Sequence, residues 1–251
     1  IAAVAQPWTL DPEVITHKLK LRFRILCEVK LSNLSLAVEG AEEAEISLNG
    51  QAVSNTITGW YVDESIKTVA LPPLKSGDNT LEIVIPFGKR TSTEWCYILG
   101  DFNVKVEGVV KTLMPATKEI GFSSITDQGM PFYGGNLIYE TEIDIPAGDL
   151  EIQVRRFRGA MVRVWVDGED KGIISYDPYC LRIPNMAAGT HKVELKLFGN
   201  RYNTFGALHD TEDASWAGPS LWRTEKDHWC YENRLRETGI LSSPIFRVLQ
   251  P

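Results

Sequence analysis

The sequence predicts an all-β protein that consists of two antiparallel β-sandwich domains in tandem. Three observations support this fold class: apolar and polar residues alternate along short segments, turn residues separate these segments, and the same arrangement occurs in both halves of the chain. Helical periodicity is nearly absent. Many short strands with few helices are typical of β-sandwiches and barrels.

The clearest strand of the first half runs through residues 19–31. Apolar residues occupy every odd position of this segment, from Leu19 to Leu31, while the even positions are charged except for Leu26. A period of two predicts a strand with one buried face and one face in water. Further strands are expected at Leu34–Val38, Glu45–Leu48, Thr68–Leu71, Thr80–Ile85 and Tyr97–Val106.

The second half repeats the plan of the first. Asn49-Gly50 follows a predicted strand and is a strong hairpin signal, and Asp167-Gly168 has the same place 118 residues later. A second pair of similar segments begins at Gly77 and Gly189, 112 residues apart, which indicates one ancestral unit with different loops. The strands expected here are Leu137–Ile145, Leu150–Val154, Met161–Val166, Ile173–Ser175, Val193–Phe198 and Ile245–Val248.

These patterns define the expected domain organisation. Residues 1–16 are expected to end a preceding module or to dock as a strand, residues 17–108 to form the first sandwich and residues 109–251 the second, with the boundary near residues 108–117. One helix is expected at Tyr231–Thr238, because Gly239 follows it at a position that helix C-caps prefer. The chain begins with Ile1, so we expect it to be a piece of a longer protein.

Charge and hydropathy exclude two classes of partner. The net charge is −7, residues 1–108 carry 10 Lys and Arg against 14 Asp and Glu, and residues 109–251 carry 16 against 19. Neither half is basic, so no nucleic-acid partner is expected. The longest apolar runs are far shorter than the roughly 20 residues of a membrane helix. The compartment stays open, with a secreted or cell-surface location slightly favoured.

The cysteines and acidic residues predict no metal site and no cofactor. Cys27 is in phase with an apolar strand face and is expected to be a buried thiol. Pairing of Cys27 with Cys96, or of Cys180 with Cys230, remains open, because spacing alone does not decide it. The acidic run at residues 210–213 is interpreted as a loop in solvent rather than as a calcium site.

The second half resembles the galactose-binding-like jelly roll, the sugar-binding accessory region of family 2 and rhamnosidase-type glycoside hydrolases. The residues that carry the resemblance are Gln128–Gly135, Val164–Gly168, Gly172, Tyr176–Tyr179 and Gly199–His209. The first half carries a fainter copy, at residues 59–63 and 77–81, without the Pro-Phe-Tyr and Arg-x-Asn segments. The resemblance implies an accessory region whose partners are a glycan ligand and the catalytic domain of the parent chain.

Sugar rings stack on aromatic side chains while their hydroxyl groups need polar partners, so a sugar site combines both kinds of residue in one group of loops. Residues 201–232 fit this description best, and a second reading has their aromatic residues capping the sandwich as a small core. The candidates outside this segment, Tyr133 and those of the first half, could equally serve packing or contact between domains. The carbohydrate-binding candidates are Arg201, Asn203, His209, Asp210, Trp216, Trp222, Tyr133, Trp60, Tyr61, Asp63 and Trp95.

No catalytic motif is present, and no catalytic residue is assigned. A glycosidase needs two carboxylates about 5–10 Å apart, and nothing in the sequence marks such a pair. The favoured function is therefore a non-catalytic carbohydrate-binding region of a multidomain glycoside hydrolase. The alternatives are a structural module that packs on the catalytic domain and positions it, and, as a weaker hypothesis, a free-standing carbohydrate-active enzyme.

Overall fold

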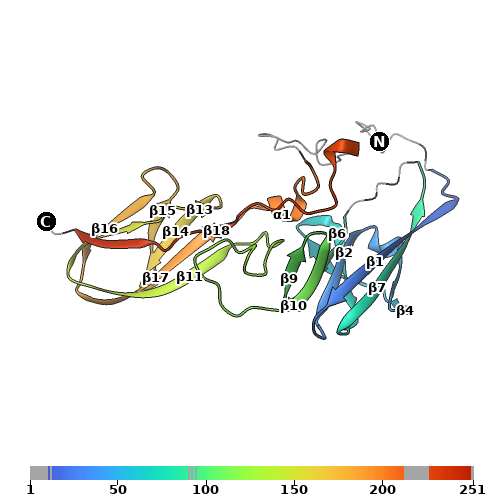
Figure 1. The fold of residues 1–251 in the computed structure, drawn as a ribbon, viewed down its shortest axis with the longest axis horizontal. Helices are drawn as coiled ribbons and strands as arrows, with labels where there is room; N and C mark the ends of the chain where they lie inside the picture. Colours follow the sequence, from blue (N-terminus) through green and yellow to red (C-terminus); the bar gives the residue numbers. More distant parts are fainter. Residues whose placement is uncertain are drawn as a thin grey trace. The chain divides into compact units, whose positions relative to one another are not determined.

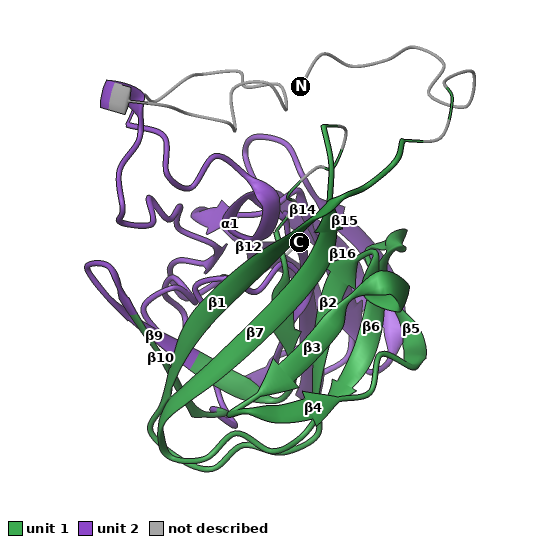
Figure 2. Cartoon of the chain, turned by 90° about the vertical axis from the view of Figure 1, so that its right-hand side faces the viewer, with its two compact units in different colours: residues 1–103, 111–116 green, residues 104–110, 117–251 purple. Residues whose placement is uncertain are grey.

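A computed structural model describes residues 11, 13–89, 91, 93, 95–211 and 226–249, and within these ranges the protein is almost entirely β (Figure 1). The predicted fold class is thereby confirmed. The chain divides into two compact units, one of residues 1–103 with 111–116 and one of residues 104–110 with 117–251 (Figure 2). The expected domain limits, after residues 16 and 108, stay a prediction.

The first unit contains two sheets. The six-stranded sheet has the order β4-β3-β7-β1-β10-β9, and the four-stranded sheet has the order β5-β6-β2-β8. Buried apolar side chains from both sheets form the core, among them Leu36, Val69 and Ile83. The elements are β1 (His17–Cys27), β2 (Leu34–Glu39), η2 (Ala41–Glu43), β3 (Glu45–Leu48), β4 (Gln51–Val53), β5 (Ile57–Tyr61), β6 (Asp63–Leu71), β7 (Gly77–Phe87), β8 (Tyr97–Leu99), β9 (Phe102–Glu107) and β10 (Val110–Pro115). Residues 104–110, at the end of β9 and the start of β10, are counted with the second unit.

The second unit contains a four-stranded sheet of order β11-β17-β14-β15, a three-stranded sheet of order β16-β12-β19 and the short pair β13-β18. One buried cluster joins these sheets, with Val164 and Leu195 from the first, Leu150 and Ile183 from the second and Ile240 from the third. The elements are β11 (Leu137–Ile145), β12 (Gly148–Gln153), β13 (Phe157–Arg158), β14 (Met161–Val166), β15 (Glu169–Ile174), β16 (Cys180–Met186), β17 (Gly189–Phe198), α1 (Tyr202–Phe205), η4 (Lys226–His228), β18 (Gly239–Ile240) and β19 (Ile245–Leu249).

Both units pair their central strands in the same way. The order β4-β3-β7-β1 in the first unit corresponds to β15-β14-β17-β11 in the second. Leu48 pairs with Leu81 in the first unit, and Val166 pairs with Val193 in the second. The corresponding residues are 118 and 112 positions apart, as in the two repeated sequence segments. The register therefore confirms that the sequence repeat is a structural repeat.

The two predicted hairpin turns are also confirmed. Asn49 and Gly50 have φ angles of 52° and 81°, and Asp167 and Gly168 have φ angles of 53° and 80°. Positive φ at both central residues is typical of a type I′ turn, whose twist matches that of the strands on either side. In each turn the side-chain oxygen of the first residue accepts a backbone N–H from the facing strand, at 2.9 Å.

The two units differ in the segment that follows the long central strand. In the first unit residues 88–96 join β7 to β8, whereas in the second unit residues 199–244 join β17 to β19. The strands at the end of each connection are equivalent, because β8 pairs with β2 and β19 pairs with β12, both antiparallel. The longer connection contains α1, η4 and β18 and adds a substantial loop region to the second sandwich.

The helix predicted at Tyr231–Thr238 is wrong. This segment is irregular, and several of its backbone groups bond to distant residues; the N–H of Arg234, for example, donates to the carbonyl oxygen of Leu208 at 2.7 Å. Gly239, expected to end the helix, begins β18 with a φ of 125°. The α-helix that the structure does contain in its described part, α1, has a single turn and was not predicted from the sequence.

Other expectations need smaller corrections. The segment predicted as one strand at residues 97–106 forms two, β8 and β9, and the segment expected at the domain boundary forms β10, which pairs in parallel with β1. In β1 the apolar face has the predicted phase, but it is fully buried only at Ile25 and Cys27, and Phe23 is 37% exposed. All four cysteines are free, and burial raises the pKa of the Cys27 thiol.

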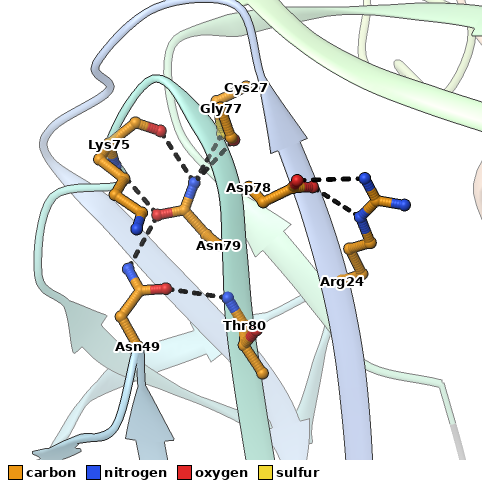
Figure 3. A network of polar contacts seen from close by, with 8 residues as sticks. All are labelled: Arg24, Cys27, Asn49, Lys75, Gly77, Asp78, Asn79 and Thr80. Atoms are coloured by element: carbon orange, nitrogen blue, oxygen red, sulfur yellow. Dashed lines mark hydrogen bonds and ion pairs between the residues drawn. The ribbon is translucent and has the colours of Figure 1, made fainter.

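A buried amide holds the turn of the first unit against the start of β7 (Figure 3). Asn79 is 1% exposed, and its Nδ2 donates to the carbonyl oxygens of Lys75 at 2.8 Å and Gly77 at 3.2 Å. Its Oδ1 accepts from the backbone N–H of Lys75 at 3.0 Å and from Nδ2 of Asn49 at 2.9 Å. One side chain therefore satisfies polar groups on two separate segments of the chain.

We predict that Asn79→Ala lowers the free energy of unfolding by about 1–3 kcal/mol, because it leaves buried polar groups without partners. The matched control is Asp78→Ala on the same strand, where an exposed carboxylate pairs with Arg24 (Figure 3). Exposed ion pairs contribute little to stability, so the loss of unfolding free energy in Asp78→Ala should be much smaller. Urea unfolding measures both variants, and equal losses would contradict the structural role of Asn79.

The equivalent position in the second unit is a histidine. His191 lies two residues after the glycine that begins β17, as Asn79 does in β7. Its Nδ1 lies 2.6 Å from Oδ2 of Asp167, and its Nε2 lies 3.0 Å from the carbonyl oxygen of Ala187. The hydrogen bond with Asp167, helped by that with Ala187, raises the pKa of His191 above 6.5. Here an ion pair replaces the amide pair of the first unit.

We predict that this ion pair makes the stability of the second unit depend on pH. A histidine whose pKa is raised by folding stabilises the fold fully below pH 6.5, its unfolded value, and this contribution is lost as pH rises through the raised pKa. Unfolding midpoints should therefore fall with rising pH in that range, and His191→Gln should flatten the dependence. His17→Gln is the control, since its ring contacts Thr16. An unchanged slope in His191→Gln would contradict the assignment.

Candidate functional site

A cleft of about 760 Å³ opens in the second unit, between β13, α1 and the segment that leads into β18. Its size falls within the range of roughly 300–1,000 Å³ that is usual for small-molecule sites. Both the long connection between β17 and β19 and the short strand β13 contribute to it. The lining residues are Arg158, Asn200, Arg201, Tyr202, Phe205, Gly206, Arg236 and Glu237.

The two walls of the cleft are joined by the side chain of Asn203. This residue is 4% exposed; its Nδ2 donates to the carbonyl oxygen of Arg236 at 2.8 Å, and its Oδ1 accepts from the N–H of Arg236 at 2.9 Å. Asn203 thus fixes the backbone of Arg236 against α1. The segment of Arg236 is also tied to β13, because Arg158 pairs with Gly239 in the β13-β18 ladder. Three segments far apart in the sequence are held together in this way.

The loop before β11 supports α1 from behind. Thr204 donates its hydroxyl group to the carbonyl oxygen of Phe132 at 2.8 Å. At Gly134 a Cβ atom would lie 2.7 Å from Oγ1 of Thr204 and 3.1 Å from Cγ of Arg201, so the backbone there passes too close for a side chain. The glycine therefore lets the loop pack directly against the helix and the stem of Arg201.

The cleft combines cationic groups with aromatic rings. The guanidinium carbon of Arg236 lies 3.8 Å from the ring centroid of Tyr202, a cation–π contact that holds the group over the ring. Nη1 of Arg158 donates to the carbonyl oxygen of Phe157 at 3.3 Å. Three guanidinium groups and one carboxylate, that of Glu237, line the cleft. Such a set can hold an oxygen-rich ligand by hydrogen bonds beside aromatic surface.

The structure separates the candidates of residues 201–211. Arg201 lines the cleft, whereas Asn203 is a buried structural residue. His209 is not part of the cleft lining; its Nδ1 bonds the carbonyl oxygen of Cys230 at 2.9 Å, and its ring stacks on Trp229 at 5.2 Å. Asp210 is 9% exposed, so the interpretation of this acidic run as a loop in solvent is wrong at its first residue.

Two tryptophans that were central to the predicted site, Trp216 and Trp222, lie outside the described residues. The described end of the same loop carries an aromatic row instead. Trp229 stacks on His209 and meets Tyr231 edge to face at 4.4 Å, and Tyr231 is 75% exposed. This row is not part of the cleft lining. Both readings of this loop, a sugar site and a small core, stay predictions.

The remaining candidates lie elsewhere. Tyr133 donates its hydroxyl group to the carbonyl oxygen of Asn136 at 3.1 Å, so its side chain stabilises the loop in which it lies. In the first unit the structure does not bring Trp60 and Trp95 into ring contact within the part it describes, although both are exposed. The last two candidates make local contacts: Tyr61 packs on Tyr97 at 5.5 Å, and Asp63 accepts from the N–H and hydroxyl group of Ser65.

Sequence reasoning missed most of the cleft. Arg158, Tyr202, Phe205 and Arg236 were not among the candidates, although a signal for the arginines was present. The chain is acidic overall, yet three arginines occur within residues 155–158 and two within residues 234–236. The first group overlaps β13, and the second lies shortly before β18. Because β13 and β18 pair with each other, the two groups come close together in the fold.

The described residues contain no group of three or more His, Cys, Asp and Glu side chains that could hold a metal ion. Among the helices of these same ranges, none is long and apolar enough to cross a membrane.

No family model matches the chain, and no curated protein matches its sequence. Among solved structures, a rhamnosidase from Novosphingobium sp. PP1Y aligns with 90% of this chain at 14% identity and a TM-score of 0.37. The Streptomyces avermitilis α-L-rhamnosidase aligns with 73% of this chain at 10% identity and a TM-score of 0.33. The Pleurotus ostreatus lectin aligns with 75% of this chain at 12% identity and a TM-score of 0.26. The chain spans 22% of the length of either rhamnosidase and 69% of the lectin. The cleft is therefore interpreted from its own residues.

We predict that Asn203→Ala lowers the free energy of unfolding by about 1–3 kcal/mol, because the backbone N–H and carbonyl groups of Arg236 lose their partners. Asn200→Ala is the control, since this neighbouring asparagine is exposed and its side chain accepts from the N–H of Tyr202. Urea unfolding compares the two variants. If both lose the same stability, the amide of Asn203 does not hold the cleft together.

Proposed function

We propose that this chain is a non-catalytic carbohydrate-binding region of a larger glycoside hydrolase, with the cleft of the second unit as its binding site. The observation that carries the proposal is the convergence of aromatic rings and hydrogen-bonding groups in one cleft, with Tyr202 and Phe205 beside Asn200, Arg201 and Glu237. Aromatic faces and polar groups together are what a sugar ring requires. The glycan is then the ligand, and the catalytic domain of the parent chain is the partner.

The position of the cleft supports this function. Most of its lining lies in the connection between β17 and β19, which is much longer than its counterpart in the first unit, on loops supported by a rigid sandwich, where binding residues are commonly found. We assign both units to the galactose-binding-like jelly-roll type on the motifs of the second half and on the shared strand order.

The composition of the cleft favours binding over catalysis. Glycosidases use two carboxylates on either side of the scissile bond. The cleft lining includes one carboxylate, that of Glu237, beside three guanidinium groups. Among the described residues, the lining offers hydrogen-bonding partners for a sugar and a single carboxylate rather than a pair.

A second candidate function is a structural module that packs on the catalytic domain. The exposed aromatic residues of the first unit favour it, above all Trp60, which is 56% exposed on strand β5 at the edge of its sheet. Large exposed aromatic side chains mark protein contacts as well as ligand sites. The two functions are compatible, because they use different units.

We predict that the chain binds immobilised glycans and that Tyr202→Ala weakens the binding by about 1–3 kcal/mol, the cost of losing an aromatic anchor. Tyr231→Ala is the matched control: Tyr231 is 75% exposed, lies in the same unit and is not part of the cleft lining. A glycan array followed by titration of the strongest hit measures both variants, and the melting temperature shows that they remain folded.

Three results would contradict this function. A glycan array on which nothing binds would contradict the carbohydrate-binding function. Equal losses of glycan affinity in Tyr202→Ala and Tyr231→Ala would contradict the assignment of the cleft as the binding site. Turnover of an aryl glycoside that survives repurification and is lost in Glu237→Gln would show a catalyst instead.

A further inference from the structure

The cleft is cationic, although the chain as a whole is acidic. Three of its eight lining residues are arginines, and with the carboxylate of Glu237 they give the lining a charge of +2, from three positive and one negative group. The whole chain has a net charge of −7. A local charge opposite to that of the protein needs a reason, because like charges that face one cavity repel one another.

These three arginines are not neutralised by carboxylates of the described residues. Other arginines of the protein are, since Arg24 pairs with Asp78 and Arg182 pairs with Asp149. No ion pair within the described ranges involves Arg158, Arg201 or Arg236. Their positive charges thus face the cavity and are available to a ligand.

One of the three is also pre-organised. The backbone of Arg236 is fixed through the amide of Asn203, and its guanidinium group is held on the ring of Tyr202 at 3.8 Å. A guanidinium group presents a planar fork of N–H donors that matches a carboxylate or sulfate group, and a side chain already held in place loses less entropy on binding.

We propose that the cleft selects anionic sugars and that Arg158, Arg201 and Arg236 bind the carboxylate or sulfate group of the sugar. This inference rests on the proposed carbohydrate-binding function and names its ligand class. The aromatic ring of Tyr202 in the same lining distinguishes a sugar from an acidic peptide, because it offers surface for the C–H face of a sugar ring. A uronic acid and a sulfated sugar share the required chemistry.

Isothermal titration calorimetry of the whole chain with four probes tests the selection. The probes are oligogalacturonate, its methyl ester, a κ-carrageenan oligosaccharide that carries sulfate only, and a neutral maltooligosaccharide. We expect oligogalacturonate, the carrageenan probe or both to bind at least about tenfold more tightly than the ester and the neutral probe, with an affinity that falls as salt is added. The stronger of the two acidic probes identifies the anionic group.

Three single variants test the site: Arg158→Gln, Arg201→Gln and Arg236→Gln. Each should weaken the binding of the acidic probe about tenfold, the usual scale for one charge-assisted contact. Arg247→Gln is the matched control, since Arg247 is an exposed arginine on β19 of the same unit and is not part of the cleft lining. Arg236→Lys should recover only part of the loss, because lysine keeps the charge without the planar fork.

The outcomes separate this inference from the proposed function. If the neutral or esterified probe binds as tightly as the acidic ones and Tyr202→Ala weakens it, the cleft binds sugar without selecting charge, and only this inference fails. It also fails if the acidic probe binds equally to all three glutamine variants, or if oligoglutamate of the same charge binds as tightly as the sugar. If no oligosaccharide binds at all, the proposed function fails with it.

Discussion

The cleft of the second unit depends on one side-chain amide. Asn203 bonds both backbone groups of Arg236, a residue 33 positions later, and so fixes an irregular segment that has no helix or strand of its own. The amide is buried, so each of its hydrogen bonds must be made within the protein. Without it, the wall that carries Arg236 and Glu237 would lose its two backbone hydrogen bonds to α1, and the contact of Arg236 with the Tyr202 ring would remain to hold it there.

The two units show how such a site arises on a repeated fold. Their central strands have the same order and register, and each has a type I′ turn whose first side chain bonds the facing strand. They differ where the chain leaves the long central strand, through residues 88–96 in one unit and residues 199–244 in the other. The shared part supplies stability, and the longer connection supplies most of the cleft.

The sequence predicted those features that depend on local patterns. Period-two alternation placed most of the expected strands, and the Asn-Gly and Asp-Gly pairs placed both hairpin turns, because these features are determined by neighbouring residues. Strands without clear alternation, such as β5 and β16, were not predicted. The cleft depends on contacts across long distances in the chain, such as Arg158 with Gly239, which no local pattern reveals. The false helix at residues 231–238 has the same origin, since Gly239 suggested a helix end while the backbone bonds elsewhere.

The most direct test of this account is a crystal structure of the chain with the tightest-binding acidic oligosaccharide. We predict that the anionic group of the sugar lies against the guanidinium groups of Arg201 and Arg236, with the sugar ring beside Tyr202. A sugar bound anywhere else on the molecule, or a cleft closed by the protein's own side chains, would contradict the assignment of the cleft as the binding site.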